Sequence, residues 1–365
     1  MGARTRGLAN NVLSSGKLDA TDAISGTIAA GNIANASLTS ATTFGSITAG
    51  VPAVASDPPS PAEGDIWYNT TTGALRFRAQ AGAWSSGGSL NSIKGNHAGV
   101  GTQTAALAFG GTTPGTTAQT ETYDGTSWTE VNDLNTARYA LMGAGTQTAG
   151  LAFGGRTAPD AYLGGVTESW NGTSWTEVNN LNSGRASGVG AGTQTSALSI
   201  GGDDSGDVLV LTESWNGTSW TEVGDQNSRH GNAGSAGVDN TSALVFGGNN
   251  PPGASPPHNA LTESWNGTSW TEINDMNTAR ANLAGVGTQT AALGFGGQDS
   301  PTFTGATENW DGTSWTELAD LSTARAYLQG AGTTTSALGF GGQNPSVYLS
   351  TTEEWTVAES NFTVG

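Results

Sequence analysis

The sequence has no cysteine, few positive charges and no long hydrophobic run. The absence of cysteine from 365 residues excludes disulfides, thiol nucleophiles, cysteine zinc sites and iron–sulfur clusters. The 12 lysines and arginines stand against 30 acidic residues, a net charge of −18, and because phosphate binding needs clustered cations we expect no nucleic-acid partner. No stretch approaches the roughly 20 apolar residues of a membrane span, and residues 1–20 contain no apolar run of signal-peptide type. Neither membrane insertion nor a secretion signal is therefore expected.

Glycine and repetition are what the sequence has in quantity. Its 56 glycines include a Gly-Gly pair that recurs at steps of 44 to 49 residues, which indicates six units. The pairs begin at Gly110, Gly154, Gly201, Gly247, Gly296 and Gly341. Each unit reads as four short strands, for example "SGVGAG", "TQTSALSIGG", "LTESW" and "SWTEV". Asn-Gly or Asp-Gly between two β-rich runs is a strong hairpin signal, so the recurring "NGT" predicts a turn between the last two strands.

The second strand of each unit predicts how the sheets pack. In "ALAFGG" the large side chains of Leu107 and Phe109 fall on one face and the small Ala108 falls on the other. A large face against a small face lets sheets stack around an axis. The first strand has few large side chains, as expected where six copies converge on a central channel. The sequence therefore predicts an all-β fold, a six-bladed β-propeller.

The repeat also resembles that of the kelch family. The double glycine, the paired aromatics and a repeat-opening arginine occur together over residues 91–365. The arginines are Arg138, Arg185, Arg229, Arg280 and Arg325. The resemblance implies that each unit folds as one blade of a kelch-like propeller, although the first unit has Lys94 in place of arginine and the sixth lacks the "NGTSW" turn. We also take it as a hypothesis that one arginine and one glutamate per blade pair between blades.

Two segments are candidates for the last strand of the sixth blade. The sequence around Trp84 aligns without gaps on that around Trp128. This alignment favours a strand from the N-terminal side that joins the two ends of the ring. The alternative is that Phe362, seven residues after Trp355, supplies the strand from the C-terminal side.

Residues 1–82 differ from the repeats. Residues 1–55 hold isolated Ile and Leu among small and polar residues without a helical or strand period, so we expect an extended, irregular segment that a partner orders. Residues 56–82 contain the Pro-rich "SDPPSPAEGD" and then "IWYNTTTGALRF", which predicts a hinge and two strands around a glycine turn. This passage resembles a module of tailed-bacteriophage fibres and appendages.

That second resemblance implies a phage virion structural protein. Residues 1–55 would then anchor the chain to other virion proteins, residues 56–82 would form a hinge and hairpin, and residues 83–365 would carry the propeller. The expected location is the surface of the virion, with assembly in the host cytoplasm. The composition of the N-terminal segment suits a threefold stalk, so a homotrimer is an open expectation, although no heptad supports it.

Catalytic chemistry has little support in the sequence. The copper-bound, cysteine-linked tyrosine of propellers of the galactose-oxidase type needs a cysteine that this chain lacks. Zinc would need ligands from His97, His230 and His258, whose spacing is not typical of a metal site. We therefore expect no enzymatic activity and no cofactor. A glycan-cleaving enzyme, which would need two carboxylates about 5 to 10 Å apart, is the least favoured class.

The six units differ from one another mainly in the loop after the second strand. These loops read "TTPGTTAQ", "RTAPDAYLGG", "DDSGDVLV", "NNPPGASPPHNA", "QDSPTFTGA" and "QNPSVYLS", and the alternation of strands puts them on one face of the propeller, here called the loop face. Variable loops on a constant scaffold are typical of recognition. The candidate ligand-binding residues are Tyr162, Arg156, Asp203, His258, Asp299, Phe303 and Tyr348, whose rings and polar groups suit a sugar.

One loop also contains acidic residues at close spacing. Asp203, Asp204 and Asp207 in "GGDDSGD" are a candidate calcium loop, but no bidentate glutamate follows at the usual spacing, and a solvated acidic turn is the favoured interpretation. The function we expect is a tail fibre or surface appendage whose loop face contacts a host-surface glycan or protein. The alternative is a capsid or tail decoration protein with a structural docking role.

Overall fold

The structure is a computed structural model, and it describes residues 52–58, 66–157, 161–162, 165–204, 207–299 and 301–364. Within strands, the side chains of residues 77–81, 161–162 and 358–364 lie outside that description. Contacts divide the chain into two units, Met1–Ala81 with Val357–Gly365, and Gly82–Thr356. Of the anchor expected over residues 1–55, only residues 52–55 are among those described. In the described part of the chain, no helix is long and apolar enough to span a membrane.

The described part of the first unit contains the predicted hairpin. Its strands are β1 (Ala53–Val54), β2 (Ile66–Asn69) and the beginning of β3 (Ala74–Ser86). Strands β2 and β3 pair antiparallel through a turn that ends at Gly73, whose φ is +68°. The carboxylate of Asp57 accepts hydrogen bonds from Asn69 Nδ2 at 2.7 Å and Trp67 Nε1 at 3.0 Å, and these bonds lower the pKa of Asp57. The glycine turn predicted from "IWYNTTTG" is confirmed.

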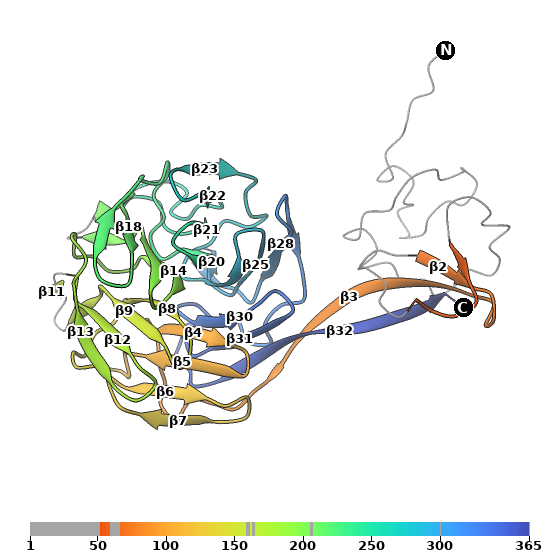
Figure 1. The fold of residues 1–365 in the computed structure, drawn as a ribbon, viewed down its shortest axis with the longest axis horizontal. Coiled ribbons are helices and arrows are strands. Elements are labelled where there is room, and N and C mark those ends of the chain that lie inside the picture. Colours follow the sequence, from red (N-terminus) through yellow and green to blue (C-terminus); the bar gives the residue numbers. More distant parts are fainter. Residues whose placement is uncertain are drawn as a thin grey trace, which may run out of the picture. The chain divides into compact units, whose positions relative to one another are not determined.

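The second unit is a β-propeller of six antiparallel blades (Figure 1). From the axis outward, the first blade consists of β4 (Ala98–Thr102), β5 (Ala105–Phe109), β6 (Thr120–Tyr123) and β7 (Trp128–Val131). The second blade consists of β8 (Met142–Gly145), β9 (Gly150–Phe153), β12 (Thr167–Trp170) and β13 (Trp175–Val178). The third blade consists of β14 (Val189–Thr193), β15 (Ser196–Ile200), β18 (Thr212–Trp215) and β19 (Trp220–Glu222). The fourth blade consists of β20 (Gly234–Asp239), β21 (Ser242–Phe246), β22 (Thr262–Trp265) and β23 (Trp270–Ile273). The fifth blade consists of β24 (Ala284–Thr288), β25 (Ala291–Phe295), β28 (Thr307–Trp310) and β29 (Trp315–Glu317). The sixth blade consists of β30 (Gln329–Gly332), β31 (Ser336–Phe340), β32 (Thr352–Val364) and β3. The predicted all-β, six-bladed fold is confirmed.

The innermost strands form a closed ring, in which each strand contacts the next and β30 contacts β4. Small residues are required there because neighbouring strands come close together. A Cβ on Gly190 would lie 2.1 Å from the carbonyl oxygen of Gly143, and a Cβ on Gly143 would lie 2.9 Å from the ring of Phe109. Real Cβ atoms do not approach other atoms this closely, so the small residues of the first strands follow from packing at the axis.

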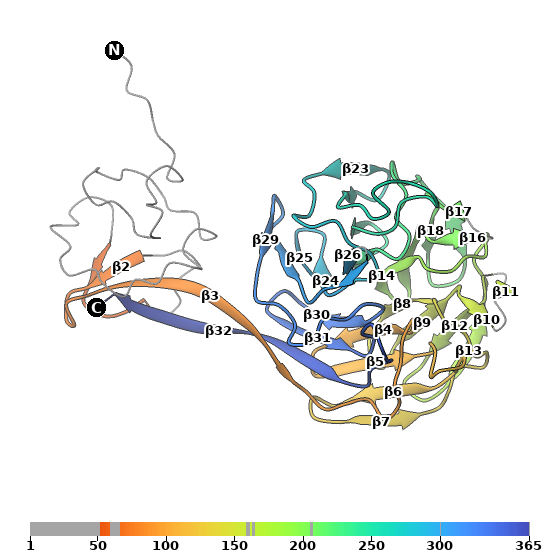
Figure 2. The ribbon, with the colours of Figure 1, turned by 180° about the vertical axis from the view of Figure 1, so that it is seen from behind.

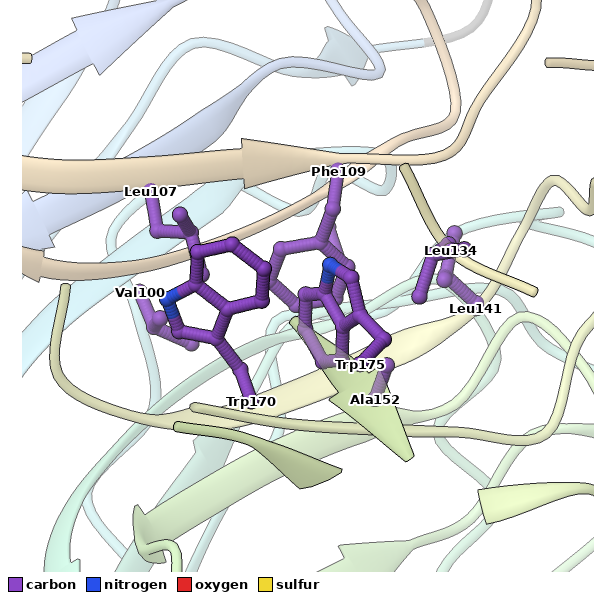
Figure 3. Packing of buried hydrophobic residues seen from close by; sticks show 9 residues of the cluster. Val100, Leu107, Phe109, Leu134, Leu141, Ala152, Trp170 and Trp175 are labelled. Carbon is purple, nitrogen blue, oxygen red and sulfur yellow. The ribbon is translucent and has the colours of Figure 1, made fainter. Parts of the chain in front are cut away.

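Blades stack large face against small face, as the second strands predict. Figure 3 shows Leu107 and Phe109 of the first blade directed toward Trp170 and Trp175 of the second, with Ala152 beside them. The rings of Phe109 and Trp175 are 4.9 Å apart. The same ring pair recurs around the propeller, as Phe153–Trp220 at 4.8 Å, Phe246–Trp315 at 4.7 Å, Phe295–Trp84 at 4.8 Å and Phe340–Trp128 at 4.9 Å. Buried aromatic pairs of this kind contribute beyond their area alone.

A ring of tryptophan hydrogen bonds settles how the propeller closes. In each blade the indole Nε1 of the fourth strand donates to a threonine hydroxyl on the third strand of the preceding blade. The bonds are Trp128–Thr352, Trp175–Thr120, Trp220–Thr167 and Trp315–Thr262 at 3.1 Å, and Trp270–Thr212 and Trp84–Thr307 at 3.0 Å. Trp84 therefore occupies the fourth-strand position of the sixth blade. Phe362 continues the third strand of that blade, β32, beyond Thr356, where the second unit ends. It does not supply a fourth strand, and the alternative closure is wrong.

A buried pair of a basic side chain and a glutamate repeats in every blade. The basic residue precedes the first strand, the glutamate lies on the third strand, and neither side chain is more than 3% exposed. The pairs are Lys94–Glu121 at 3.3 Å, Arg138–Glu168 at 3.1 Å, Arg185–Glu213 at 2.6 Å, His230–Glu263 at 3.3 Å, Arg280–Glu308 at 3.1 Å and Arg325–Glu353 at 2.7 Å. The two partners belong to the same blade, so the hypothesis of pairing between blades is wrong.

The fourth blade corrects the alignment of the repeats. The sequence pattern assigns its opening position to Arg229, but Arg229 is exposed and His230 is buried in the ion-pair position. His230 Nδ1 lies 2.7 Å from the carbonyl oxygen of Gly247. The equivalent contact in the second blade is the hydrogen bond that Arg138 donates to the carbonyl oxygen of Gly154 at 3.1 Å. We call the stacked second strands, the tryptophan–threonine bonds and the opening basic–glutamate pairs together the frame.

Candidate functional site

The six variable loops are attached to the segments that open the blades. In every blade the first residue after the Gly-Gly pair forms a backbone bridge with the residue after the opening basic residue. The bridges are Gly95–Thr112, Tyr139–Arg156, Ala186–Asp203, Gly231–Asn249, Ala281–Gln298 and Ala326–Gln343. Three loops continue as small hairpins, which are β10 (Arg156–Thr157) with β11 (Ala161–Tyr162), β16 (Asp203–Asp204) with β17 (Asp207–Val208), and β26 (Gln298–Asp299) with β27 (Thr302–Phe303). The first two lie at the outer edge of the propeller in Figure 2.

The opening segments are joined to one another by a closed ring of backbone hydrogen bonds. Each bond runs from the amide of one blade to the carbonyl of the preceding one, as Ala140–Asn96, Ser187–Ala140, Asn232–Ser187, Asn282–Asn232, Tyr327–Asn282 and Asn96–Tyr327, at 2.7 to 3.3 Å. All six residues have φ between 51° and 58°, a left-handed conformation that is uncommon for alanine and tyrosine. The ring fixes the bases of all six loops relative to one another.

The cavities along the axis are small. The one at the hydrogen-bonded ring has a volume of about 60 Å³, and a second one among the first strands has about 80 Å³. His97 lines the first cavity and is 1% exposed. Its burial and then the positive charge of Lys94 lower the pKa of His97 to about 3. Cavities of this size hold ordered water but not a drug-sized or sugar-sized ligand.

Two of the predicted site residues form an ion pair between neighbouring loops. Arg156 of the second blade contacts Asp203 of the third, and their side chains are 23% and 19% exposed. Tyr162 stands opposite Arg156 in the β10–β11 hairpin, and its side chain lies outside the described residues. The structure therefore links blades two and three at the base of their loops.

The acidic loop of the third blade forms a hairpin. Asp203 pairs with Val208 and Asp204 pairs with Asp207, and the latter two side chains are exposed. Among the residues that the structure describes, no group of three acidic, histidine or cysteine side chains is placed to hold a metal ion. The candidate calcium loop thus gains no support from the described residues, and the interpretation as a solvated acidic turn stays a prediction.

The remaining predicted residues also lie between loops. His258 of the fourth blade is 9% exposed and hydrogen-bonded to the backbone of Gln298 in the fifth. Burial lowers the pKa of His258, and the negative charge of Asp299 opposes that change. Phe303 stands opposite Gln298 in the β26–β27 hairpin and is half-buried.

Tyr348 joins the sixth blade to the first. A Cβ on Gly95 would lie 2.6 Å from the ring of Tyr348, so the ring packs directly on the opening segment of the first blade. Its side chain is half-buried. The seven residues are thus distributed around the loop face rather than gathered in one place.

A further cavity, on the loop face, lies between the third and fourth blades. It has a volume of about 310 Å³ and is lined by Asp203 and Val208 on one side, and by residues 249–254 and Pro257 on the other. Of its lining residues the sequence pointed only to Asp203. The signal that identifies the other wall is the length of the loop "NNPPGASPPHNA", which exceeds the other five and contains four prolines. The volume is at the lower end of the range for small-ligand pockets.

Comparisons with known proteins identify the fold of the chain. No protein-family model matches the chain, and no curated protein matches it. Solved structures do match, and one described as "Structure of YjhT" covers 76% of this chain and 99% of that chain, with a TM-score of 0.61 and 13% sequence identity. At this identity the likeness shows the fold alone, and the chain is a β-propeller.

Proposed function

We propose that this protein is a binding propeller of the kelch type on a bacteriophage virion, where its loop face recognises a glycan on the host surface. Residues 1–55 would attach it to other virion proteins as part of a tail fibre or appendage. The observation that carries the proposal is the contrast between frame and loops. The buried basic–glutamate pair and the backbone ring recur in all six blades, whereas the six loops vary in length and composition.

The geometry favours the loops over the axis as the place of binding. The axial cavities of about 60 and 80 Å³ are too small for a sugar ring, whereas the cavity between the third and fourth blades has about 310 Å³. Recognition by weak individual sites suits an appendage, because several copies on one particle raise avidity by about 10² to 10⁴. The two phage-like features, the "GDIWYNTTTG" passage and the N-terminal composition, supply the virion part of the proposal.

The same cavity favours binding over glycan cleavage. Glycoside hydrolysis uses two carboxylates about 5 to 10 Å apart. Among the described residues that line the cavity, Asp203 alone is acidic, and it is paired with Arg156. The second carboxylate that hydrolysis needs is not among the described residues that line the cavity.

The test is binding of the fluorescently labelled full chain, displayed on beads in many copies, to a panel of bacterial strains. A loop-face variant carries Tyr162→Ala, Phe303→Ala and Tyr348→Ala. A matched control carries three substitutions at exposed turns between third and fourth strands, Thr173→Ala, Thr218→Ala and Thr268→Ala. We expect at least one strain to bind the wild type and the control but to lose the loop-face variant.

Three results would count against the proposal. Equal binding by both variants would exclude Tyr162, Phe303 and Tyr348 from recognition. Absence of binding to every strain, together with burial of the loop face against other subunits in images of the virion, would favour a decoration protein. Release of reducing sugar from host envelopes would instead support a glycan-cleaving enzyme.

A further inference from the structure

We infer that the cavity between the third and fourth blades is a subsite for one neutral hexose unit of a surface polysaccharide. The inference rests on the proposed function and deepens it, since it names the place on the loop face and the chemical class of the ligand. The volume of about 310 Å³ admits a single pyranose ring with its first solvent shell and excludes a longer, fully enclosed oligosaccharide.

One wall of the subsite is a rigid proline loop. Asn249 N donates to the carbonyl of Gly231 at 2.6 Å, which ties the start of the loop to the opening segment of the blade. Asn250 closes the loop on itself, since its backbone amide donates to Pro257 O at 2.8 Å and its side-chain amide to Pro256 O at 2.9 Å. Proline restricts φ, and a loop already fixed in one conformation loses little entropy when a ligand binds.

The other wall is the acidic hairpin of the third blade. Asp203 is held by Arg156 from the neighbouring blade, and Val208 beside it is 8% exposed. A carboxylate has about four lone-pair positions, so it accepts from a ligand hydroxyl while it remains paired with an arginine. The two walls come from different blades, whose separation is fixed by the frame and by the backbone ring.

The chemistry of the lining selects a neutral, hydroxyl-rich ligand. The proline rings and Ala254 present aliphatic surface to the C–H face of a pyranose, and Asp203 with the side-chain amide of Asn249 supplies partners for its hydroxyls. Among the described lining residues there is no lysine or arginine to receive a phosphate or carboxylate, and no aromatic ring to stack on a base. The net charge of −18 further disfavours an acidic sugar.

The test uses the full chain and methyl glycosides of glucose, galactose and mannose as probes, with glucuronic acid as the charged comparison. Binding is followed by saturation-transfer NMR and titration. The variant Ala254→Trp places an indole in the cavity, and Val347→Trp, at a side chain that is 57% exposed in the sixth blade, is the matched control. We expect saturable binding of at least one neutral glycoside, weakened about tenfold or more by Ala254→Trp because the ligand loses its buried contact, and unchanged by Val347→Trp.

Each other outcome bears on a different claim. Binding of a neutral glycoside that Ala254→Trp leaves unchanged overturns the subsite but not glycan recognition by the loop face. Preference for glucuronic acid overturns the neutral class. If host cells bind the chain but no glycoside does, the hexose assignment is wrong and host recognition is still supported. If neither cells nor glycosides bind, the hexose assignment and the proposed host recognition are both wrong. If Ala254→Trp lowers the melting temperature, Ala254→Leu, with a smaller side chain, takes its place.

Discussion

In the frame of this propeller the same buried contacts recur six times, whereas the loops that the frame carries differ in length, charge and ring content. The recurrence has a physical cause: each glutamate of an opening pair lies in a protein interior where an unpaired charge costs several kcal/mol. A loop on the surface meets no such penalty. The comparison shows that the buried contacts of the frame recur from blade to blade, whereas the exposed loops vary. The effect of a substitution in the frame therefore says little about the effect of a substitution in the loops.

The largest effect should follow from breaking one opening ion pair. Glu168→Gln leaves the guanidinium of Arg138, which is fully buried, without its countercharge. Removal of one partner of a buried pair costs about 3 to 5 kcal/mol. Glu177, which stands opposite Glu168 on the fourth strand and is exposed, provides the matched control, and Glu177→Gln should change the free energy of unfolding by less than about 0.5 kcal/mol.

The measurement is denaturant unfolding of the two variants and the wild type. Equal effects at Glu168 and Glu177 would contradict the separation of frame and surface. The bonds from Asn135 N at 2.7 Å and Asn135 Nδ2 at 2.8 Å both end on Glu168 Oε2, so the single amide oxygen of glutamine can keep them. Its NH2 group then takes the place of Oε1 and faces the guanidinium of Arg138, which cannot donate to it.

A second test uses pH, at a buried position where one blade departs from the others. His97 occupies the place that Leu141, Leu283 and Leu328 hold in other blades, and its pKa is lowered from about 6.5 to about 3 by burial and then by the charge of Lys94. Below pH 6.5 the unfolded chain therefore takes up a proton that the folded chain refuses, and stability falls with falling pH until about pH 3.

The expected size of this pH effect is about 2 kcal/mol between pH 7 and pH 5, since one pKa unit corresponds to about 1.4 kcal/mol. His97→Leu should remove the pH dependence that His97 causes. The free energy of unfolding should therefore change less between pH 7 and pH 5 in the variant than in the wild type. The comparison is made by thermal unfolding at pH 7, 6 and 5, above the range in which the carboxylates titrate. Parallel curves would mean that the folded protein accepts the proton, and the claim of a neutral buried imidazole would be wrong.

The frame could be predicted from the sequence further than the loop face could. The Gly-Gly period, the "NGT" turns and the alternation of Leu107, Ala108 and Phe109 indicated the blades and their stacking, because backbone turns and burial depend on local residue type. The gap-free alignment of Trp84 on Trp128 also indicated the closing strand. Most of these features recur from unit to unit, and a local sequence pattern that recurs at a regular spacing is easier to recognise than a single occurrence.

Sequence reasoning failed where the repeat is broken. In the fourth blade it took Arg229 as the opening cation, because arginine stands there in four other units, while the structure buries the adjacent His230. The one-residue difference changes which side chain faces the core. The cavity between the third and fourth blades was missed for another reason, since its walls come from two loops with no sequence relation to each other, and only their spatial adjacency makes a site.

The smallest predicted effect is a repair of this fourth blade. Gln226 occupies the position that Leu134, Leu181 and Leu321 fill in other blades; it is 4% exposed, and neither of its side-chain amide atoms has a hydrogen-bond partner. Burial of an unsatisfied amide costs about 1 to 3 kcal/mol. Gln226→Leu should therefore raise the free energy of unfolding by about 1 kcal/mol, and Leu181→Gln, the reverse change in the third blade's opening segment, should lower it by at least as much.

Both variants are measured by denaturant unfolding, with binding to host cells assayed in parallel. A gain in stability without a change in binding means that the irregularity of the fourth blade is independent of its long loop. A gain in stability with a loss of binding means instead that Gln226, which approaches Gly201 at the base of the third-blade loop, adjusts the loop face through its base. Destabilisation by Gln226→Leu would show that the amide has a partner such as a buried water, and the prediction of a costly unsatisfied amide would be wrong.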